Sequence, residues 1–336
     1  MFNKKSILIT GGTGSLGNAL VKKIIEEYKP SRLIIFSRDE VKQLEMRKIF
    51  PEEKYKFMRY FLGDVRDALR VREALRGVDY VVHAAALKQV PSGEYNPIEI
   101  IKTNIYGAQN IIEGCIANNV KQTIALSTDK AANPINLYGA SKLASDKLFV
   151  AANNISGKNK NKFSVVRYGN VTNSRGSVVP IFRDILKRGE TFFPITDKRM
   201  TRFWITLDQG VDFVLKSFQR MHGGEIFVPK IPSIYITDLA KSFSEKLPLK
   251  ETGIRPGEKL HEIMCPRDDS HLTIEFKDHF VIKPSINIFD QKTDYKKNKL
   301  GEKGKKVKQQ SEYTSDKNKD FLKISDIQKV LNNIKS

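Results

Sequence analysis

Short apolar runs alternate with amphipathic segments through the first half of the chain. The apolar runs are only a few residues long, as expected for buried strands, and they lie at Ile7–Thr10, Arg32–Phe36, Phe57–Leu62, Tyr80–Val82, Thr123–Leu126 and Phe163–Val166. Helical patterns separate them, at Leu16–Tyr28, Glu40–Phe50, around Val71, at Ile98–Asn118 and at Leu137–Val150. This alternation predicts a Rossmann-type α/β fold, a doubly wound parallel sheet with helices on both faces. Such sheets bind ligands outside the carboxyl ends of their strands.

The pattern becomes irregular after residue 170, where polar and basic loops such as the one at 197–202 interrupt it. We therefore expect residues 1–170 to form the Rossmann domain, and residues 171–290 to form a smaller α/β lobe into which some core elements return. Residues 291–336 are expected to be a lysine-rich tail segment with a terminal helix at Ser325–Ile334.

The net charge of +20 raises the question of a nucleic-acid partner. Between residues 291 and 320 the chain has ten lysines, no arginine and five acidic residues. A stacking platform for nucleic acid would need more aromatic side chains than this segment has. A solvated, mobile tail is therefore favoured and no nucleic-acid partner is expected. A basic surface would also attract a doubly charged sugar nucleotide.

Cysteine content and hydropathy indicate the compartment. Cys115 and Cys265 are too few and too far apart for a disulfide framework, and each is interpreted as a buried thiol. The apolar run near the N-terminus is too short for a signal peptide, and no stretch approaches the length of a membrane span. We expect a cytoplasmic protein with no membrane partner and no metal site.

A glycine-rich run, Thr-Gly-Gly-Thr-Gly-Ser-Leu-Gly at 10–17, follows the first predicted strand and opens the first predicted helix. Gly11 permits a tight turn, Gly14 lets the backbone approach a pyrophosphate, and Gly17 lets the helix pack closely. The helix N-terminus adds free N–H groups and a partial positive charge. A turn without a ligand is the alternative, but the strand–turn–helix context favours a dinucleotide. The pyrophosphate contacts are assigned to Thr13, Gly14, Ser15 and Leu16.

The second predicted strand ends in Phe-Ser-Arg-Asp at 36–39. An NAD enzyme usually has a carboxylate here, whereas an arginine accommodates the 2′-phosphate of NADP. Arg38 lies nearer the strand end than Asp39, which predicts NADP; alternatively, both residues only cap the next helix. The remaining cofactor contacts are assigned to Ser37, Arg38, Asp39, Lys42, Asp64, Val65, Ala84 and Lys88.

A Tyr-x-x-x-Lys pair, Tyr138 and Lys142, lies on the helix that follows the fifth predicted strand. Positions i and i+4 share a helix face, so the ammonium of Lys142 is expected to lower the phenol pKa of Tyr138. A phenolate so tuned takes a hydroxyl proton while hydride leaves the same carbon. Both residues are also assigned to cofactor binding.

These features resemble the extended short-chain dehydrogenase/reductase superfamily over nearly the whole chain. The resemblance narrows at Ser-Thr-Asp-Lys, residues 127–130. In sugar-nucleotide 4,6-dehydratases of the deoxythymidine-diphosphate-glucose type the corresponding run is Thr-Asp-Glu, so Lys130 replaces a glutamate. This departure is similar to the inverting, PseB-type UDP-N-acetylglucosamine 4,6-dehydratases, which open the route to pseudaminic acid. The runs at 133–139, 167–171, 199–204 and 253–259 match that family too.

The resemblance implies NADP-dependent 4,6-dehydration of UDP-N-acetylglucosamine with inversion at C5. Tyr138 and Lys142 would serve oxidation at C4, with Thr128 beside the nicotinamide. Asp129 would be the acid at C6 and Lys130 the base at C5. Lys130 acts as a base only when neutral, which burial favours and Asp129 opposes. Alternatively, Asp129 and Lys130 form an ordinary surface ion pair at a strand end.

For substrate binding, the resemblance places Asn170 and Arg255 on the UDP-sugar, with Lys88 and Arg202 as further candidates. The planar fork of arginine suits a diphosphate because it bonds two oxygens at once. Alternatively, Arg199 and Arg202 belong to a solvated basic loop. The resemblance also implies a homo-oligomer, often a hexamer.

Three other functions remain open. A C5-retaining dehydratase would share most of the site. A UDP-sugar 4-epimerase or simple reductase would need the glycine turn and the Tyr/Lys pair but has no use for Asp129 and Lys130. A non-catalytic NADP-binding regulator, or an RNA binder using the lysine-rich segment, would not need an intact Tyr138 and Lys142.

Overall fold

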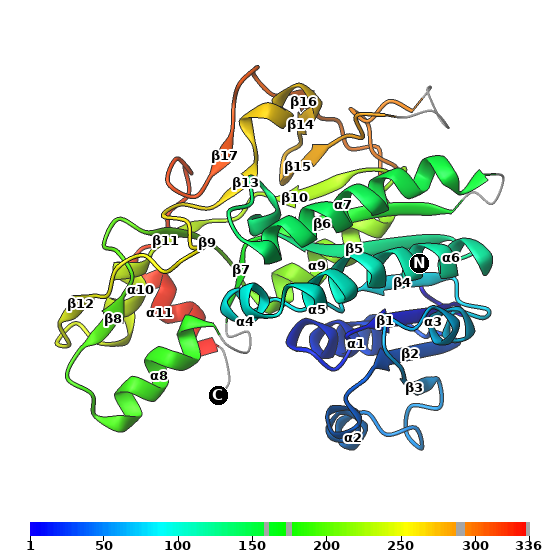
Figure 1. The fold of residues 1–336 in the computed structure, drawn as a ribbon, viewed down its shortest axis with the longest axis horizontal. Helices are drawn as coiled ribbons and strands as arrows, with labels where there is room; N and C mark the ends of the chain where they lie inside the picture. Colours follow the sequence, from blue (N-terminus) through cyan, green and yellow to red (C-terminus); the bar gives the residue numbers. More distant parts are fainter. Residues whose placement is uncertain (158–160, 173–176, 287–292, 334–336) are drawn as a thin grey trace.

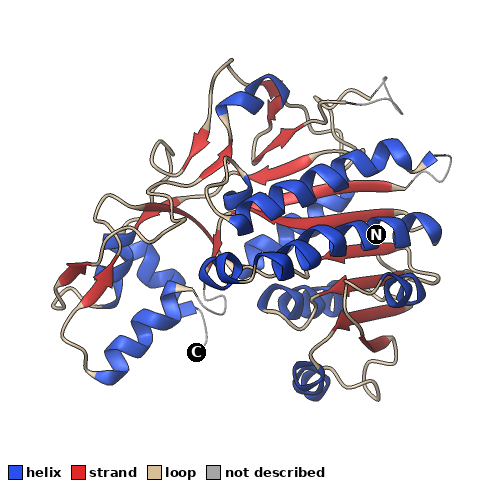
Figure 2. Cartoon of the chain, in the orientation of Figure 1, coloured by secondary structure: helices blue, strands red, loops and turns tan. Residues whose placement is uncertain are grey.

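The computed structural model describes residues 1–157, 161–172, 177–286 and 293–333, and Figures 1 and 2 show its architecture. A ten-stranded sheet has the order β16-β14-β15-β10-β6-β5-β4-β1-β2-β3. Its parallel strands are β3 (Met58–Leu62), β2 (Arg32–Ser37), β1 (Ser6–Thr10), β4 (Tyr80–His83), β5 (Gln122–Thr128), β6 (Lys162–Tyr168) and β10 (Ile226–Pro229). The order 3-2-1-4-5-6 confirms the predicted doubly wound Rossmann sheet.

Helices cover both faces of this sheet (Figure 1). One face carries α1 (Ser15–Glu27), α2 (Glu40–Ile49) and α9 (Leu207–Arg220), and the other carries α3 (Ala68–Ala74), α6 (Gly107–Ala117) and α7 (Leu137–Ile155). Successive side chains of a strand point to opposite faces, so Ile7 and Ile9 pack in the first core and Leu8 in the second. Burial on both faces explains why these strands are continuously apolar.

The predicted helix at Ile98–Asn118 is interrupted in the structure. It consists of α5 (Pro97–Ile101), a π-helical turn η1 (Lys102–Tyr106) and α6. Asn104 in the π-helical turn is buried, and its amide donates to the Leu87 carbonyl at 2.9 Å and to the Ser141 hydroxyl at 3.0 Å. A short helix α4 (Val90–Tyr95) was not predicted, because Pro91 and Gly93 lie within it.

The smaller lobe lies on the left of Figure 1 and has its own apolar core, which includes Phe182, Phe193 and Trp204. It consists of α8 (Val178–Arg188), β8 (Phe193–Ile195), β9 (Thr201–Ile205), β11 (Ser233–Tyr235), α10 (Ile236–Phe243), β12 (Leu249–Glu251) and α11 (Ile324–Asn333), with β7 (Asn170–Val171) joining β9. Other segments after residue 170 return to the large sheet, namely α9, β10 and the antiparallel strands β14 (Thr273–Glu275), β15 (His279–Ile282) and β16 (Lys305–Lys306).

The expectation that the lysine-rich segment is a mobile tail is wrong. β16 pairs with β14, and β17 (Tyr313–Thr314) pairs with β13 (Ile263–Cys265). The Tyr313 hydroxyl donates to the Ile231 carbonyl at 2.9 Å, and Ser315 is fully buried. In the described part of the segment, small polar residues such as Thr314 and Ser315 are buried and Tyr313 is half-buried, while the lysines stay exposed to solvent. The predicted boundary at 290–291 and the predicted helix end at Ile334 lie outside the described residues.

Within the part of the chain that the structure describes, no helix combines the length and the apolar character that crossing a membrane requires.

Candidate active site

A cavity of about 910 Å³ lies where the carboxyl ends of β1 to β5 meet the smaller lobe. It is lined by nearly all of the residues predicted for the site: Thr13, Gly14, Ser15, Leu16, Ser37, Arg38, Asp39, Lys42, Asp64, Val65, Ala84, Lys88, Thr128, Lys130, Tyr138, Lys142, Asn170, Arg202 and Arg255. Asp129 is the exception, because its side chain is fully buried behind Thr128 and Lys130. The structure therefore brings the dinucleotide, Tyr/Lys and substrate candidates into one space.

The glycine turn fits a dinucleotide. Gly11 has a φ of +64°, and a Cβ there would lie 2.9 Å from the Ala85 backbone. A Cβ on Gly17 would overlap the Gly12 carbonyl, so α1 packs closely only because residue 17 is glycine. Gly14 is the N-cap of α1 and makes no side-chain cap. The first N–H groups of the helix therefore face the cavity without a side-chain competitor, which suits a pyrophosphate.

Arg38 and Asp39, which follow β2, make different contacts in the structure. The Asp39 carboxylate accepts the backbone N–H of Lys42 at 3.0 Å, which caps α2, and also pairs with the Lys42 ammonium at 2.6 Å. The capping alternative therefore holds for Asp39. Arg38 is about half exposed, and its guanidinium lies 3.5 Å from Asp64. Burial opposes ionisation of Asp64, but two-pronged bonding by Arg66 lowers the Asp64 pKa overall.

The Tyr/Lys helix begins directly beside the catalytic turn. Asn136 caps α7 by accepting the Gly139 N–H at 2.7 Å. A Cβ at Gly139 would overlap the Lys130 carbonyl, so glycine lets α7 start against the turn that holds Asp129 and Lys130. This close approach explains how two motifs eight or more residues apart line one wall of the cavity.

The expected lowering of the Tyr138 pKa by Lys142 is wrong. Burial raises the pKa of Tyr138 to about 12, opposed by the charge of Lys130 and a hydrogen bond with Thr128. Burial also lowers the pKa of Lys142, although Asp146 opposes it. Desolvation outweighs the helical Tyr/Lys pairing because both groups are enclosed.

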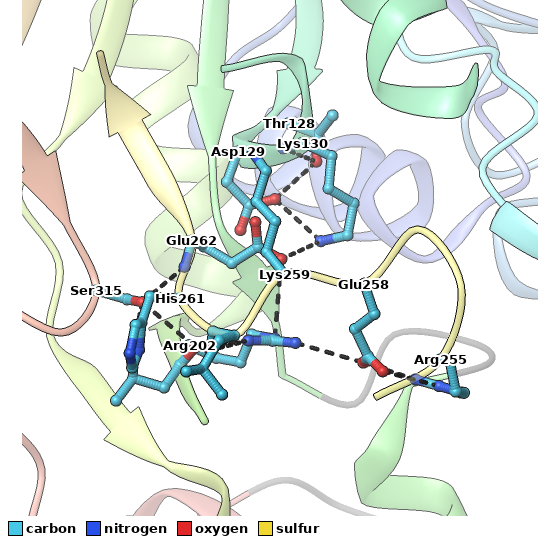
Figure 3. Close-up of polar contacts among 12 residues, drawn as sticks. Thr128, Asp129, Lys130, Arg202, Arg255, Glu258, Lys259, His261, Glu262 and Ser315 are labelled. Carbon is cyan, nitrogen blue, oxygen red and sulfur yellow. Dashed lines mark hydrogen bonds and ion pairs between the residues drawn. The ribbon is translucent and has the colours of Figure 1, made fainter. Parts of the chain in front are cut away.

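Asp129 and Lys130 form a 3₁₀ turn η2 (Asp129–Ala131) at the end of β5. The Lys130 ammonium donates to Asp129 Oδ1 at 3.1 Å and to Glu262 Oε1 at 3.2 Å, and the Thr128 hydroxyl donates to the same Asp129 oxygen at 3.0 Å (Figure 3). The two carboxylates are only 1–2% exposed and Lys130 about a quarter. The surface-ion-pair alternative is therefore excluded by the burial.

The pKa values of both members of this pair are raised above their ordinary values. Burial, and next the charge of Glu262, raise the pKa of Asp129. Burial alone would lower the pKa of Lys130, but the two carboxylates outweigh it and raise that pKa. The raised pKa favours the ammonium form of Lys130, whereas its proposed role as a base requires the neutral amine.

Arg202 and Arg255 converge on a third carboxylate, Glu258 (Figure 3). Arg255 makes a two-pronged contact with Glu258 at 2.8 and 3.0 Å, while Arg202 reaches it at 3.3 Å. Arg202 is buried, whereas Arg199 is mostly exposed and pairs with Asp197. The solvated-loop alternative thus describes Arg199 but not Arg202.

Two residues of the site were missed from the sequence. Glu262 lies just beyond the Gly253–Lys259 run, and no local motif marks it. Asn104 connects the π-helical turn to Ser141 on the Tyr/Lys helix, and a lone asparagine inside a helical pattern gives no sign of that contact.

Together, the glycine turn, the Tyr138/Lys142 helix and the strand order define a short-chain dehydrogenase/reductase. Its paired acid and ammonium at the end of β5 exceed what simple hydride transfer requires.

Comparisons with known proteins agree with this class. The family model described as "Polysaccharide biosynthesis protein" matches residues 7–284. The UDP-N-acetylglucosamine 4,6-dehydratase (inverting) of Campylobacter jejuni is 59% identical over 332 residues, covering 99% of this chain and 98% of that protein. A UDP-glucose 4-epimerase of Rickettsia conorii is 43% identical over 84% of each chain. The X-ray structure of Pen from Bacillus thuringiensis is 34% identical and superposes with a TM-score of 0.88 over 99% of this chain and 98% of that chain. The chain therefore belongs to the polysaccharide biosynthesis protein family.

Proposed function

We propose that the protein is an NADP-dependent, C5-inverting 4,6-dehydratase of UDP-N-acetylglucosamine. The identity of 59% to the Campylobacter jejuni enzyme extends over both full lengths. The observation that carries the proposal is the Asp129–Lys130 pair, in which Lys130 lines the same cavity as Tyr138 and Asp129 is buried next to it. Its product would be the first intermediate on the route to pseudaminic acid.

Two basic side chains at the end of β2 support NADP. Arg38 and Lys42 line the cavity where the ribose 2′-position would lie, while the Asp39 carboxylate already caps α2. A carboxylate so engaged is poorly placed to accept a ribose hydroxyl, and an arginine favours a 2′-phosphate. When bound, the cofactor supplies the hydride acceptor for C4 and the hydride donor for C6.

In the oxidation at C4, we assign Tyr138 as the group that takes the proton of the C4 hydroxyl. Thr128 and Tyr138 both line the cavity, and the Thr128 hydroxyl opposes the rise in the pKa of Tyr138. Lys142 lies one helical turn further on the same face, and its charge would stabilise the phenolate once formed. The resulting ketone acidifies the C5 hydrogen.

We assign the elimination of water to Asp129 and Lys130, as the acid and the base respectively. The raised pKa of Asp129 keeps a proton available for the departing C6 hydroxyl. Lys130 is the base at C5, and its ammonium proton must first pass to solvent, to which about a quarter of the side chain is exposed. Substrate that fills the cavity excludes water, and desolvation favours the neutral amine.

We assign the binding of the substrate diphosphate to Arg255 and Arg202. Asn170 and Lys88 line the same cavity and are further candidates for substrate contacts. The Glu258 carboxylate accepts hydrogen bonds from both guanidinium groups. A diphosphate would compete with that carboxylate for the same two-pronged geometry.

Turnover of UDP-N-acetylglucosamine in heavy water tests the proposal. We expect loss of water and a 6-deoxy-4-keto product that carries deuterium at C5, with the inverted configuration in its proton spectrum. A labelled product of retained configuration would replace inversion by retention. A 4-epimer without label at C5 would overturn the proposal in favour of an epimerase.

A further inference from the structure

Glu262 is the buried carboxylate that completes the catalytic turn from the opposite side. It precedes β13, and Ser315 holds its backbone on both sides, with the Glu262 N–H donating to Ser315 Oγ at 2.9 Å and the Ser315 N–H to the Glu262 carbonyl at 2.8 Å. Its Oε1 accepts from Lys130 and lies 3.8 Å from the Arg202 guanidinium. Among the described residues its Oε2 has no hydrogen-bond partner.

Asp129 and Glu262 thus share a single ammonium. Each turns one oxygen to Lys130, and each leaves its other oxygen without a partner in the described structure. Two enclosed carboxylates that contact the same ammonium repel each other at low dielectric, so ionisation of one raises the pKa of the other. One of the two carboxyl groups is therefore expected to have a raised pKa and to hold a proton more readily than the other.

The surrounding charges decide which carboxylate that is. Glu262 faces three cations, Lys130, Arg202 and Lys259, and although burial opposes it, their charges lower its pKa overall. The cation in direct contact with Asp129 is Lys130, and burial together with the Glu262 charge raises the pKa of Asp129. Of the two carboxyl groups, Asp129 therefore holds a proton more readily than Glu262.

We propose that Glu262 is a positioning residue of the dehydration step, whose buried negative charge, anchored by Lys130 and Arg202, keeps the proton on Asp129 for transfer to the C6 hydroxyl. This inference rests on the proposed function. In the step, the C5–H electron pair becomes the second C5–C6 bond as Lys130 takes the proton. The C6–O pair leaves with the oxygen, which takes the Asp129 proton and departs as water. The Asp129 carboxylate that remains is stabilised by the Lys130 ammonium formed in the same event.

The titratable and charged groups around this centre come from every element packed against it. They are Lys88 after β4, Asp129 and Lys130 in η2, Tyr138 and Asp146 on α7, Arg167 on β6, Arg202 on β9, and Glu258, Lys259 and Glu262 before β13. Of the carboxylates, Glu262 is the one that shares the Lys130 ammonium with Asp129.

The variant Glu262→Gln tests this role, because the amide keeps an acceptor for Lys130 and removes the charge. Without that charge the pKa of Asp129 falls, so its proton is lost at lower pH. We expect the decline of kcat with rising pH to move about one unit toward acid, with a roughly tenfold lower rate at neutral pH. Since C4 oxidation precedes the slowed step, we also expect reduced nicotinamide to accumulate, visible by its absorbance during turnover.

The conservative variant Glu262→Asp keeps the charge and is expected to restore the wild-type pH profile even if its rate is lower. Glu258→Gln is the matched comparison: it removes a neighbouring carboxylate that bonds Arg202 and Arg255 but not Lys130. It should change KM and leave the pH profile in place. Retained cofactor and a cooperative thermal transition establish that each variant is folded.

A wild-type pH profile in Glu262→Gln, or a slow rate with no build-up of reduced nicotinamide, would overturn the inference. The same shift in Glu262→Asp would also overturn it, because loss of packing rather than charge would then be the cause. Failure of the proposed function is distinguished by the unaltered protein in the same assay, which would then release no dehydrated product.

Discussion

Arg167 donates a hydrogen bond of 3.1 Å to the carboxylate of Asp146, and both side chains are almost completely buried. The same Asp146 oxygen accepts from the Ser127 hydroxyl at 2.8 Å, and Arg167 also donates to the Met264 carbonyl at 3.0 Å. One ion pair therefore connects α7 to β5, β6 and β13. These elements carry the Tyr/Lys pair, the catalytic turn and the strand that follows Glu262.

Removal of one partner of this ion pair should be costly. Asp146→Ala leaves the Arg167 charge buried and unpaired, so we expect the free energy of unfolding to fall by about 3–5 kcal/mol. Asp212, an exposed partner of Lys23, offers a matched control, and Asp212→Ala should cost less than about 1 kcal/mol. Urea unfolding of both variants checks the difference. Equal losses would show that the buried pair contributes no more than a surface pair.

Tyr138 and Lys130 should fail at different steps. Tyr138→Phe removes the group that takes the C4 hydroxyl proton, so neither reduced nicotinamide nor product should form. Lys130→Ala spares C4 oxidation but removes the C5 base, so reduced nicotinamide should appear without product, and turnover should fall by about a hundredfold or more. Rapid-mixing absorbance with product analysis separates the two. Dehydrated product at the wild-type rate from Lys130→Ala would refute the base role.

Arg255 and Arg199 can be compared directly because both side chains are largely exposed. In each, a guanidinium nitrogen lies 2.7–2.8 Å from a carboxylate oxygen. Arg255 lines the cavity, whereas Arg199 pairs with Asp197 outside it. We expect Arg255→Ala to raise KM for the sugar nucleotide about tenfold or more, since hydrogen bonds to charged groups contribute about 1.5–3 kcal/mol. Steady-state kinetics should show little change for Arg199→Ala. Equal effects would argue for a general charge effect.

The cofactor preference should depend on Arg38. Arg38→Gln removes the cation nearest the end of β2, and we expect NADP affinity to fall about tenfold with NAD affinity little changed. Arg47, on α2, pairs with Glu52 and does not line the cavity, so Arg47→Gln serves as the control. Fluorescence titration of each variant with both cofactors measures this. A parallel loss for NAD and NADP would contradict a 2′-phosphate contact.

Stability should fall as the protein is acidified, in part because of His83. This imidazole is fully buried, and desolvation, reinforced by the charge of Lys142, lowers its pKa to about 3. A lowered folded-state pKa favours the neutral form, so the stabilisation is complete above the unfolded pKa of about 6.5 and is lost as pH falls toward 3. Between pH 7 and 5 we expect a loss of about 2 kcal/mol from this residue. Urea unfolding at both pH values should show a smaller difference in His83→Gln than in a variant of the exposed His271.

The Rossmann half was predictable because its information is local. The apolar strands, the glycine turn and the i, i+4 Tyr/Lys spacing each lie within one or two elements, and the structure brings their residues to one cavity. Long-range contacts were not predictable. Glu262 reaches Lys130 across 132 positions of sequence, and nothing near Glu262 indicates that partner.

Composition misled where a few residues decide the structure. The lysines of residues 293–320 suggested a mobile tail. Hydrogen bonds nevertheless join Tyr313 to Ile231, and Ser315 to Thr201 and Glu262. The expected tuning of Tyr138 failed for a related reason. Helical spacing predicted proximity to Lys142, whereas the degree of burial, which depends on the whole fold, set the pKa.

The clasp of Ser315 on Glu262 has a consequence for the order in which the protein matures. Synthesis runs from the N-terminus, and domains generally fold in that direction. The strands β1 to β6 and the Tyr/Lys helix are complete by residue 168, long before Ser315 has been made. A nascent chain stalled on the ribosome before residue 315 would have its cofactor turn but not a secured Glu262, and so would lack a finished catalytic centre. Catalytic competence is thus acquired only after residue 315 has been translated.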